Sequence, residues 1–187
     1  MKTKNKLVIF GCKDTTFECI SYLINKRIDI DLLITIDPEI AEKNEVAGYF
    51  DLTEYAKNNH IQTYSCISYS LKNEIDFNYL NQYTFELGFV IGWQRLIPEW
   101  LLRKFSIGVF GMHGSAKALP FGRGRSPMNW SLIQNKSLFI TNLFKYNPGI
   151  DDGDILDTQI FDLNSFDDAR TVHYKNTLSL LKINRKK

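Results

Sequence analysis

The feature that most constrains the fold is a pair of short apolar segments near the start of the chain, with a helical pattern between them. Residues 7–10 read Leu-Val-Ile-Phe, and residues 30–36 form the second segment. Residues 7–10 are a continuous apolar run, residues 30–36 are mostly apolar, and both are rich in β-branched residues, which suits strands that are buried on both faces. Thr15 and Glu18 have the spacing of a capping box for the intervening helix. Strand, helix and strand in this order predict two parallel strands joined by a right-handed crossover.

The same alternation continues along the chain. Further strands are expected at residues 61–66, 85–91, 107–112, 139–146 and 155–161. Helices are expected at residues 52–58, from Lys72 toward Tyr83, at 98–104 and from Pro127 to about Gln134. A last helix is expected to begin with a cap formed by Ser165 and Asp168 and to end at about Leu181. The predicted fold class is α/β: a Rossmann-like, open, mostly parallel twisted sheet with helices on both faces and an antiparallel return strand near the C-terminus. Without a recognisable linker, residues 1–187 are expected to form a single domain.

Charge and cysteine usage exclude several classes of protein. The net charge is only +2, and no basic stripe alternates with aromatic residues, so we expect no nucleic-acid partner. Cys12, Cys19 and Cys66 are odd in number and lack CxxC spacing, which disfavours a disulfide framework or a metal site. The apolar runs are too short for a signal peptide or a membrane span. We therefore expect a cytoplasmic protein with no membrane partner and no metal.

Polar residues beyond the carboxyl ends of the predicted strands are the candidates for a site, because open α/β sheets bind ligands there. His113 follows the predicted strand at 107–112 and opens a loop of small residues, and Asp151, Asp152 and Asp154 lie before the return strand. An aspartate facing His113 would orient the imidazole and favour its charged form, which helps an amine to lose a proton during attack on a carbonyl. A structural histidine and an ordinary tight turn remain the alternatives.

A second candidate is the glycine-rich segment around residue 123. Gly122 and Gly124 allow the backbone to approach a ligand closely, and Arg123 and Arg125 can bind phosphate or carboxylate through paired hydrogen bonds. The segment matches neither the Walker nor the dinucleotide-binding glycine pattern. Anion binding and solubilising loop charge are equally good interpretations of the two arginines.

Taken in order, these motifs resemble the catalytic domain of the 10-formyltetrahydrofolate-dependent formyltransferases, which include methionyl-tRNA formyltransferase, glycinamide ribonucleotide transformylase and the sugar N-formyltransferases. The family motif, roughly Asn-x-His-Pro-Ser-Leu-Leu-Pro followed by Arg-Gly and Pro, is matched by residues 111–120, Arg123-Gly124 and Pro127. The family's Asp-x-Gly-Asp motif is matched by residues 151–154. Gly92-Trp93 after a predicted strand is similar to the sugar-modifying members.

The resemblance implies transfer of a formyl group from 10-formyltetrahydrofolate to a primary amine of a small acceptor, first of all a nucleotide-linked amino sugar for a surface polysaccharide such as lipopolysaccharide. It implies His113 and Asp151 as catalytic residues. It assigns folate to Trp93, Gln94, Arg95, Leu96, Ile97, Gly149 and Ile150, and the acceptor to Ser115, Arg123, Gly124 and Arg125. We expect no tRNA-binding C-terminal domain, and the resemblance leaves a homodimer open.

One departure from the family pattern bears on activity. The family's catalytic asparagine, which helps to hold the formyl oxygen, aligns with Gly111. Losing one donor to a developing oxyanion typically costs about 10²–10³ in rate. Asn129, at the start of the helix after the loop, is a candidate replacement. The alternatives are a weakly active or inactive binding protein of the same fold, and a hydrolase of formyltetrahydrofolate.

Overall fold

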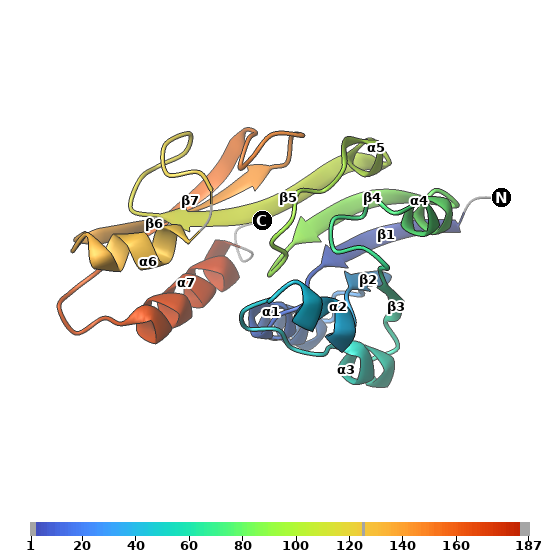
Figure 1. Ribbon diagram of the computed structural model, residues 1–187, viewed down its shortest axis with the longest axis horizontal. Coiled ribbons are helices and arrows are strands. Elements are labelled where there is room, and N and C mark those ends of the chain that lie inside the picture. The colour runs from blue at the N-terminus through green and yellow to red at the C-terminus, as the bar shows by residue number, and fades with distance from the viewer. Residues whose placement is uncertain (1–2, 125, 184–187) are drawn as a thin grey trace. The chain divides into compact units, whose positions relative to one another are not determined.

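The computed structural model describes residues 3–124 and 126–183, in which strands and helices alternate (Figure 1). The strands are β1 (Thr3–Phe10), β2 (Leu32–Thr35), β3 (Gln62–Ser65), β4 (Tyr83–Val90), β5 (Phe105–Ser115), β6 (Leu138–Lys145) and β7 (Ile155–Asp162). The helices are α1 (Asp14–Asn25), α2 (Pro38–Lys43), α3 (Thr53–Asn58), α4 (Glu74–Leu80), α5 (Glu99–Leu102), α6 (Pro127–Ile133) and α7 (Ala169–Ile183). The strand order in the sheet is β3-β2-β1-β4-β5-β6-β7.

The chain divides into two compact units, residues 1–110 and 111–187. In the first unit β1 runs parallel to both β2 and β4, and β2 runs parallel to β3. Val8, Ile9 and Phe10 in β1 are completely buried, as a strand covered on both faces requires. The expectation of a single domain stays a prediction.

Two clusters of side chains bury the faces of this parallel ladder. On one face Ile9 and Leu33 pack with residues of α1 and α3, among them Ile20 and Ala56. On the other face the ring of Phe10 contacts the rings of Trp93 and Phe105. Because neighbouring residues of a strand point to opposite faces, the continuous apolar run 7–10 supplies both clusters.

The second unit is built on an antiparallel pair. β6 pairs with β7 from Leu138 opposite Asp162 to Phe144 opposite Ile155. α6 and α7 pack on one side of this pair (Figure 1). The core there is formed by Phe139, Leu163 and Val172, with Met128, Leu132 and Phe161 packed around them.

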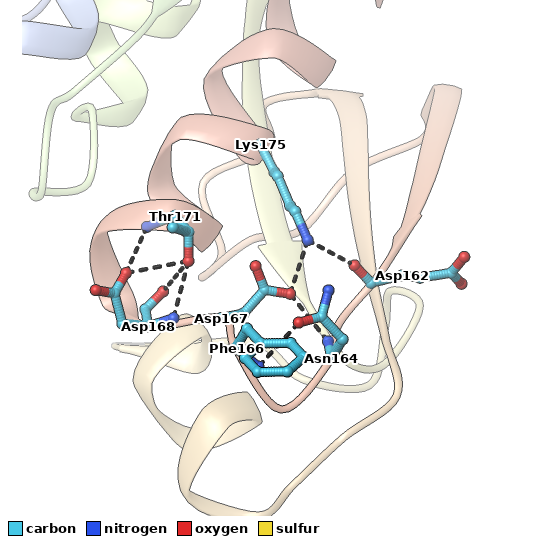
Figure 2. Close-up of polar contacts among 7 residues, drawn as sticks. All are labelled: Asp162, Asn164, Phe166, Asp167, Asp168, Thr171 and Lys175. Carbon is cyan, nitrogen blue, oxygen red and sulfur yellow. Dashed lines mark hydrogen bonds and ion pairs between the residues drawn. The ribbon is translucent and has the colours of Figure 1, made fainter.

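The start of α7 is held by a reciprocal cap. Thr171 N donates to Asp168 Oδ1 at 2.8 Å, and Asp168 N donates to Thr171 Oγ1 at 2.8 Å (Figure 2). Beside the cap, Lys175 Nζ donates to Asp167 Oδ2 at 2.7 Å and to the carbonyl oxygen of Asp162 at 3.1 Å (Figure 2). The hydrogen bond from the Thr171 N–H lowers the pKa of Asp168, and that from Lys175 lowers the pKa of Asp167.

The predicted α/β class, the parallel pairs and the antiparallel return strand are confirmed. The predicted helix caps were partly wrong. α1 begins at Asp14, and the preceding Lys13 N–H donates to Thr16 Oγ1 at 3.2 Å, so Thr15 and Glu18 do not form the cap. Ser165 lies in the turn before α7, where Asp168 caps the helix instead.

Two further corrections concern element boundaries. α2 was not expected, yet Asp37 Oδ1 accepts from Ile40 N at 2.9 Å and Pro38 fits the first turn, so Asp37-Pro38 both ends a strand and starts a helix. β5 continues through Ser115, so His113 lies within a strand instead of opening a loop. The longer strand fixes the backbone that carries the imidazole.

Candidate active site

His113 and Asp151 face each other in the second unit. His113 Nδ1 lies 3.4 Å from Asp151 Oδ2. The imidazole is buried, and the carboxylate is partly exposed. Of the three neighbouring aspartates, Asp152 pairs with an arginine instead, and Asp154 is exposed. The geometry thus brings together the histidine and the particular aspartate that the motif singled out, and their catalytic role remains a prediction.

The turn between β6 and β7 positions the carboxylate. Lys145 N donates to the carbonyl oxygen of Asp154 at 3.0 Å, which closes the turn. Gly153 has a φ of 142°, and a Cβ at this residue would lie 1.6 Å from the Lys145 carbonyl oxygen, so glycine is required. Asp151 itself has a φ of 43°, in the left-handed region that aspartate tolerates better than most residues. Gly124 N donates to Asp151 Oδ2 at 2.8 Å and anchors the carboxylate to the glycine-rich loop.

The same loop fixes the other side of the imidazole. His113 Nε2 lies 2.7 Å from the carbonyl oxygen of Gly122. A carbonyl only accepts, so Nε2 carries a hydrogen and donates it, which leaves Nδ1 toward Asp151. Gly122 has a φ of 81°, and a Cβ there would lie 2.3 Å from Ser115 Oγ. The glycine therefore allows the contact that sets the tautomer.

Of the residues predicted to bind the acceptor, Ser115 and Arg123 line a cavity of about 180 Å³, whereas Gly124 is not part of its lining. Its lining includes Ser115, Lys117, Arg123, Trp130, Ser131 and Lys136. Arg123 Nη2 pairs with Asp152 Oδ1 at 2.9 Å, and both side chains are exposed, so the pair contributes little to stability. Ser115 Oγ donates to the carbonyl oxygen of Lys117 at 2.6 Å. Arg125 lies outside the described residues.

The residues predicted to bind folate fall in two loops, one in each unit. In the first unit, Trp93 and Ile97 are buried, and Gln94 and Leu96 are exposed. Arg95 places its guanidinium 4.9 Å from the centre of a tyrosine ring. Within residues 3–124 and 126–183, Trp93 Nε1 has no hydrogen-bond partner although it is buried. An unpaired buried donor is costly, and a ligand would satisfy it.

The second loop is the β6–β7 turn. Gly149 is half-buried, whereas the side chain of Ile150 is 57% exposed. The exposed apolar side chain of Ile150 is next to Asp151 in the chain. Folate binding by either loop stays a prediction.

Asn129 was predicted to be the replacement donor, and no role was predicted for Tyr146. Asn129 is exposed on the first turn of α6, and its side chain makes no hydrogen bond to the residues that the structure describes. The Tyr146 ring, by contrast, lies against Gly111. The signal in the sequence was the missing asparagine itself, which calls for a polar group elsewhere, although no spacing rule leads from residue 111 to residue 146.

Two classes of feature are absent from the part of the chain that the structure describes. No three histidine, cysteine, aspartate or glutamate side chains gather there in a way that could hold a metal ion. None of the described helices has the length and apolar character needed to cross a membrane.

The chain is similar in sequence to methionyl-tRNA formyltransferases. No protein-family model matches the chain. The chain is 26% identical over 172 residues to a methionyl-tRNA formyltransferase from Azobacteroides pseudotrichonymphae, a match that covers 91% of this chain and 52% of the relative. The chain therefore spans about half the length of the curated relatives that it matches.

Two solved structures of formyltransferases share the fold of this chain. A phosphoribosylglycinamide formyltransferase from Bacillus halodurans superposes with a TM-score of 0.74 at 16% identity, covering 97% of this chain and 96% of that one. An N-formyltransferase from Helicobacter canadensis, in complex with folinic acid and dTDP-3-aminofucose, superposes with a TM-score of 0.66 at 23% identity, covering 96% and 62%. In both sequence and fold, the chain resembles the folate-dependent formyltransferases.

Proposed function

We propose that the chain transfers a formyl group from 10-formyltetrahydrofolate to the primary amine of a nucleotide-linked amino sugar. The observation that carries the proposal is the His113–Asp151 pair, which is held in place by Gly122 and Gly124. The similarity to formyltransferases supports the formyl donor. The neighbour in complex with folinic acid and dTDP-3-aminofucose supports the class of acceptor.

The proposed reaction forms one bond, breaks one bond and moves one proton. The amine nitrogen of the acceptor bonds to the formyl carbon, the bond from that carbon to the folate nitrogen breaks, and the amine loses one proton while the leaving folate nitrogen gains one. His113 Nδ1 is the ring nitrogen that can take up the proton, because the carbonyl oxygen of Gly122 already accepts a hydrogen from Nε2. Asp151 stabilises the imidazolium that forms, at 3.4 Å from Nδ1.

The proposed folate contacts use backbone groups and a few apolar side chains. In the first unit, Leu96 exposes an apolar side chain in the Trp93–Ile97 loop, and the unpaired Trp93 Nε1 can donate to a heterocycle. In the second unit, Ile150 gives a similar apolar surface. Each of these loops, taken by itself, has features that suit a flat heteroaromatic ring.

The proposed acceptor site is the cavity beside the glycine-rich loop around Arg123. Lys117, Arg123 and Lys136 line it, so its charge favours a phosphate-bearing acceptor. Trp130 lies at the same cavity and offers a ring on which a base can stack. Positive charge near a ring suits a nucleotide, and this is why we favour a nucleotide-linked amine over an unmodified amino sugar.

The decisive experiment is a mass-spectrometric assay with a panel of nucleotide-linked amino sugars, an unmodified amino sugar and methionyl-tRNA, each with 10-formyltetrahydrofolate. A gain of one formyl group on a nucleotide-linked amine is the expected result. Formylation of methionyl-tRNA alone would replace the acceptor that we propose. A chain that formylates none of these amines, and that binds no folate analogue in calorimetry, would contradict the function itself.

The second candidate is hydrolysis of formyltetrahydrofolate, and the specific observation behind it is Gly111. Without the family's amide, an attacking water could replace the amine, and formate would be released in the absence of any acceptor. Measuring formate release with and without an amine separates the two reactions. Transfer requires that product formation depend on the amine, whereas hydrolysis proceeds without it.

A further inference from the structure

The side of β5 that carries the catalytic histidine has an unusual neighbour at Gly111. A Cβ at this residue would lie 2.1 Å from Cε2 and 2.9 Å from Oη of Tyr146. No real side chain tolerates such a contact, so the phenol occupies the volume that a side chain at residue 111 would fill. The Tyr146 ring is itself held in place, since it stacks on Phe144 with 4.9 Å between centroids and 16° between planes.

The phenol and the imidazole lie on the same face of β5. Residues 111 and 113 are two apart in a strand, so both point to one face. Gly114 points to the other face, where a Cβ would lie 2.4 Å from the ring of Phe139, which is packed under α6 and α7. Tyr146, which meets Gly111, is therefore on the side of His113 and away from those helices.

Asp151 interacts with both His113 and Tyr146. Its carboxylate lies 3.4 Å from His113 Nδ1. Burial raises the pKa of Tyr146, and the negative charge of Asp151 raises it further. The phenol thus keeps its hydrogen under physiological conditions. Tyr146 is half-buried, and no hydrogen bond between its hydroxyl and another residue is found within residues 3–124 and 126–183. A protonated donor therefore stands free beside the catalytic pair.

We propose that Tyr146 donates its phenolic hydrogen bond to the formyl oxygen as the acceptor amine attacks, in place of the asparagine that the family carries at the position of Gly111. This proposal rests on the proposed function. As the nitrogen–carbon bond forms, the carbonyl electron pair moves onto oxygen, and the Tyr146 O–H stabilises that charge without giving up its proton. When the pair returns, the bond to the folate nitrogen breaks, and the proton held by His113 is available to that nitrogen.

Tyr146→Phe is the first test, because it removes only the hydroxyl and keeps the ring that packs on Phe144. We expect kcat for formyl transfer to fall by about 10²-fold, with the KM values for folate and acceptor changed by less than about threefold. Thermal unfolding should match the wild type. Tyr174→Phe is the matched control, because Tyr174 is 63% exposed on α7 and its change should leave kcat unaltered.

The second test replaces the Tyr146 phenol with an asparagine at residue 111. Gly111→Asn alone should disrupt the site, because its side chain would collide with the phenol. Tyr146→Ala with Gly111→Asn removes the collision and returns an amide to the family position, so its kcat should exceed that of Tyr146→Ala by at least about tenfold. A tyrosine with a purely structural role gives no such rescue, and absence of rescue would count against the proposal.

The results separate this proposal from the function on which it rests. An active wild type with an equally active Tyr146→Phe variant overturns the donor role and leaves the function intact. If Asn129→Ala then lowers kcat about 10²-fold, the donor is that amide instead. A wild-type chain that formylates no amine overturns both.

Discussion

The two compact units differ in what their strands bury. In residues 1–110, β1 buries Val8, Ile9 and Phe10 completely, and β2 buries Leu32, Leu33 and Ile34 to the same extent. In residues 111–187, the buried side chains of β5 and β6 include His113, Ser115, Thr141 and Asn142. Buried polar groups are costly unless paired, so natural sequences keep them where they serve a purpose. We therefore expect the first unit to contribute mainly stability, although β2 also buries the polar Thr35, and we expect the second unit to carry the reacting groups that we propose.

The largest expected effect tests the stability side of this comparison. Phe10→Ala should lower the free energy of unfolding by about 3–5 kcal/mol, because the ring is fully buried against Trp93 and Phe105 and its loss leaves a cavity. Phe166→Ala in the second unit, where the ring is 93% exposed, should change it by less than about 0.5 kcal/mol. Urea unfolding followed by circular dichroism measures both. Similar losses in the two variants would break the comparison.

The next prediction tests the proposed catalytic role of His113 and Asp151. His113→Ala and Asp151→Asn should each lower turnover by at least about 10²-fold, because each removes a group that moves or stabilises the transferred proton. Asp154→Asn is the control, since this carboxylate belongs to the same motif but is exposed. Formyl transfer under saturating conditions is the measurement, with circular dichroism to check the fold. Turnover close to that of the wild type in either His113→Ala or Asp151→Asn would refute the assignment.

Two single-tryptophan variants test which ligand each unit binds. Trp93 lies in the proposed folate loop of the first unit, and Trp130 lines the proposed acceptor cavity of the second. With the other two tryptophans changed to phenylalanine, the fluorescence of Trp93 should respond to a folate analogue more than to a dinucleotide. The fluorescence of Trp130 should respond to a nucleotide-linked sugar. A Trp93 signal that ignores folate at concentrations where calorimetry detects binding would remove that loop from the site.

The smallest expected effect concerns the cap of α7. The pKa of Asp168 lies below its ordinary value of 3.8 in the folded chain, so its contribution to stability is present above that value and is lost as the pH falls through the lowered pKa. Asp168→Ala should therefore lower the melting temperature at pH 7, and the deficit should shrink once the pH is below about 3.8. Ser165→Ala should have no such effect at either pH. A deficit in Ser165→Ala equal to that in Asp168→Ala would reinstate the cap that the sequence pattern suggested.

Local pattern was sufficient for most of the fold. The apolar run 7–10 and the recurring strand–helix alternation predict a parallel sheet because burial on both faces leaves few other arrangements. Asp37-Pro38 shows the limit of such reasoning. The pair was interpreted only as the end of a strand, yet an aspartate before a proline also begins a helix, and the structure uses both properties at once.

The candidate site also has some features that the sequence predicts and others that only the structure shows. By itself the sequence determined that His113 and Asp151 belong to motifs in a known order, and that Gly111 breaks the pattern. Only the tertiary structure decided that Gly122 fixes the tautomer of the imidazole, that Gly124 anchors the carboxylate, and that Tyr146 fills the space beside Gly111. The physical reason is that these contacts join residues far apart in the chain. Their geometry depends on the end of a strand, a glycine loop and a hairpin turn together, and no periodicity or spacing within one segment encodes it.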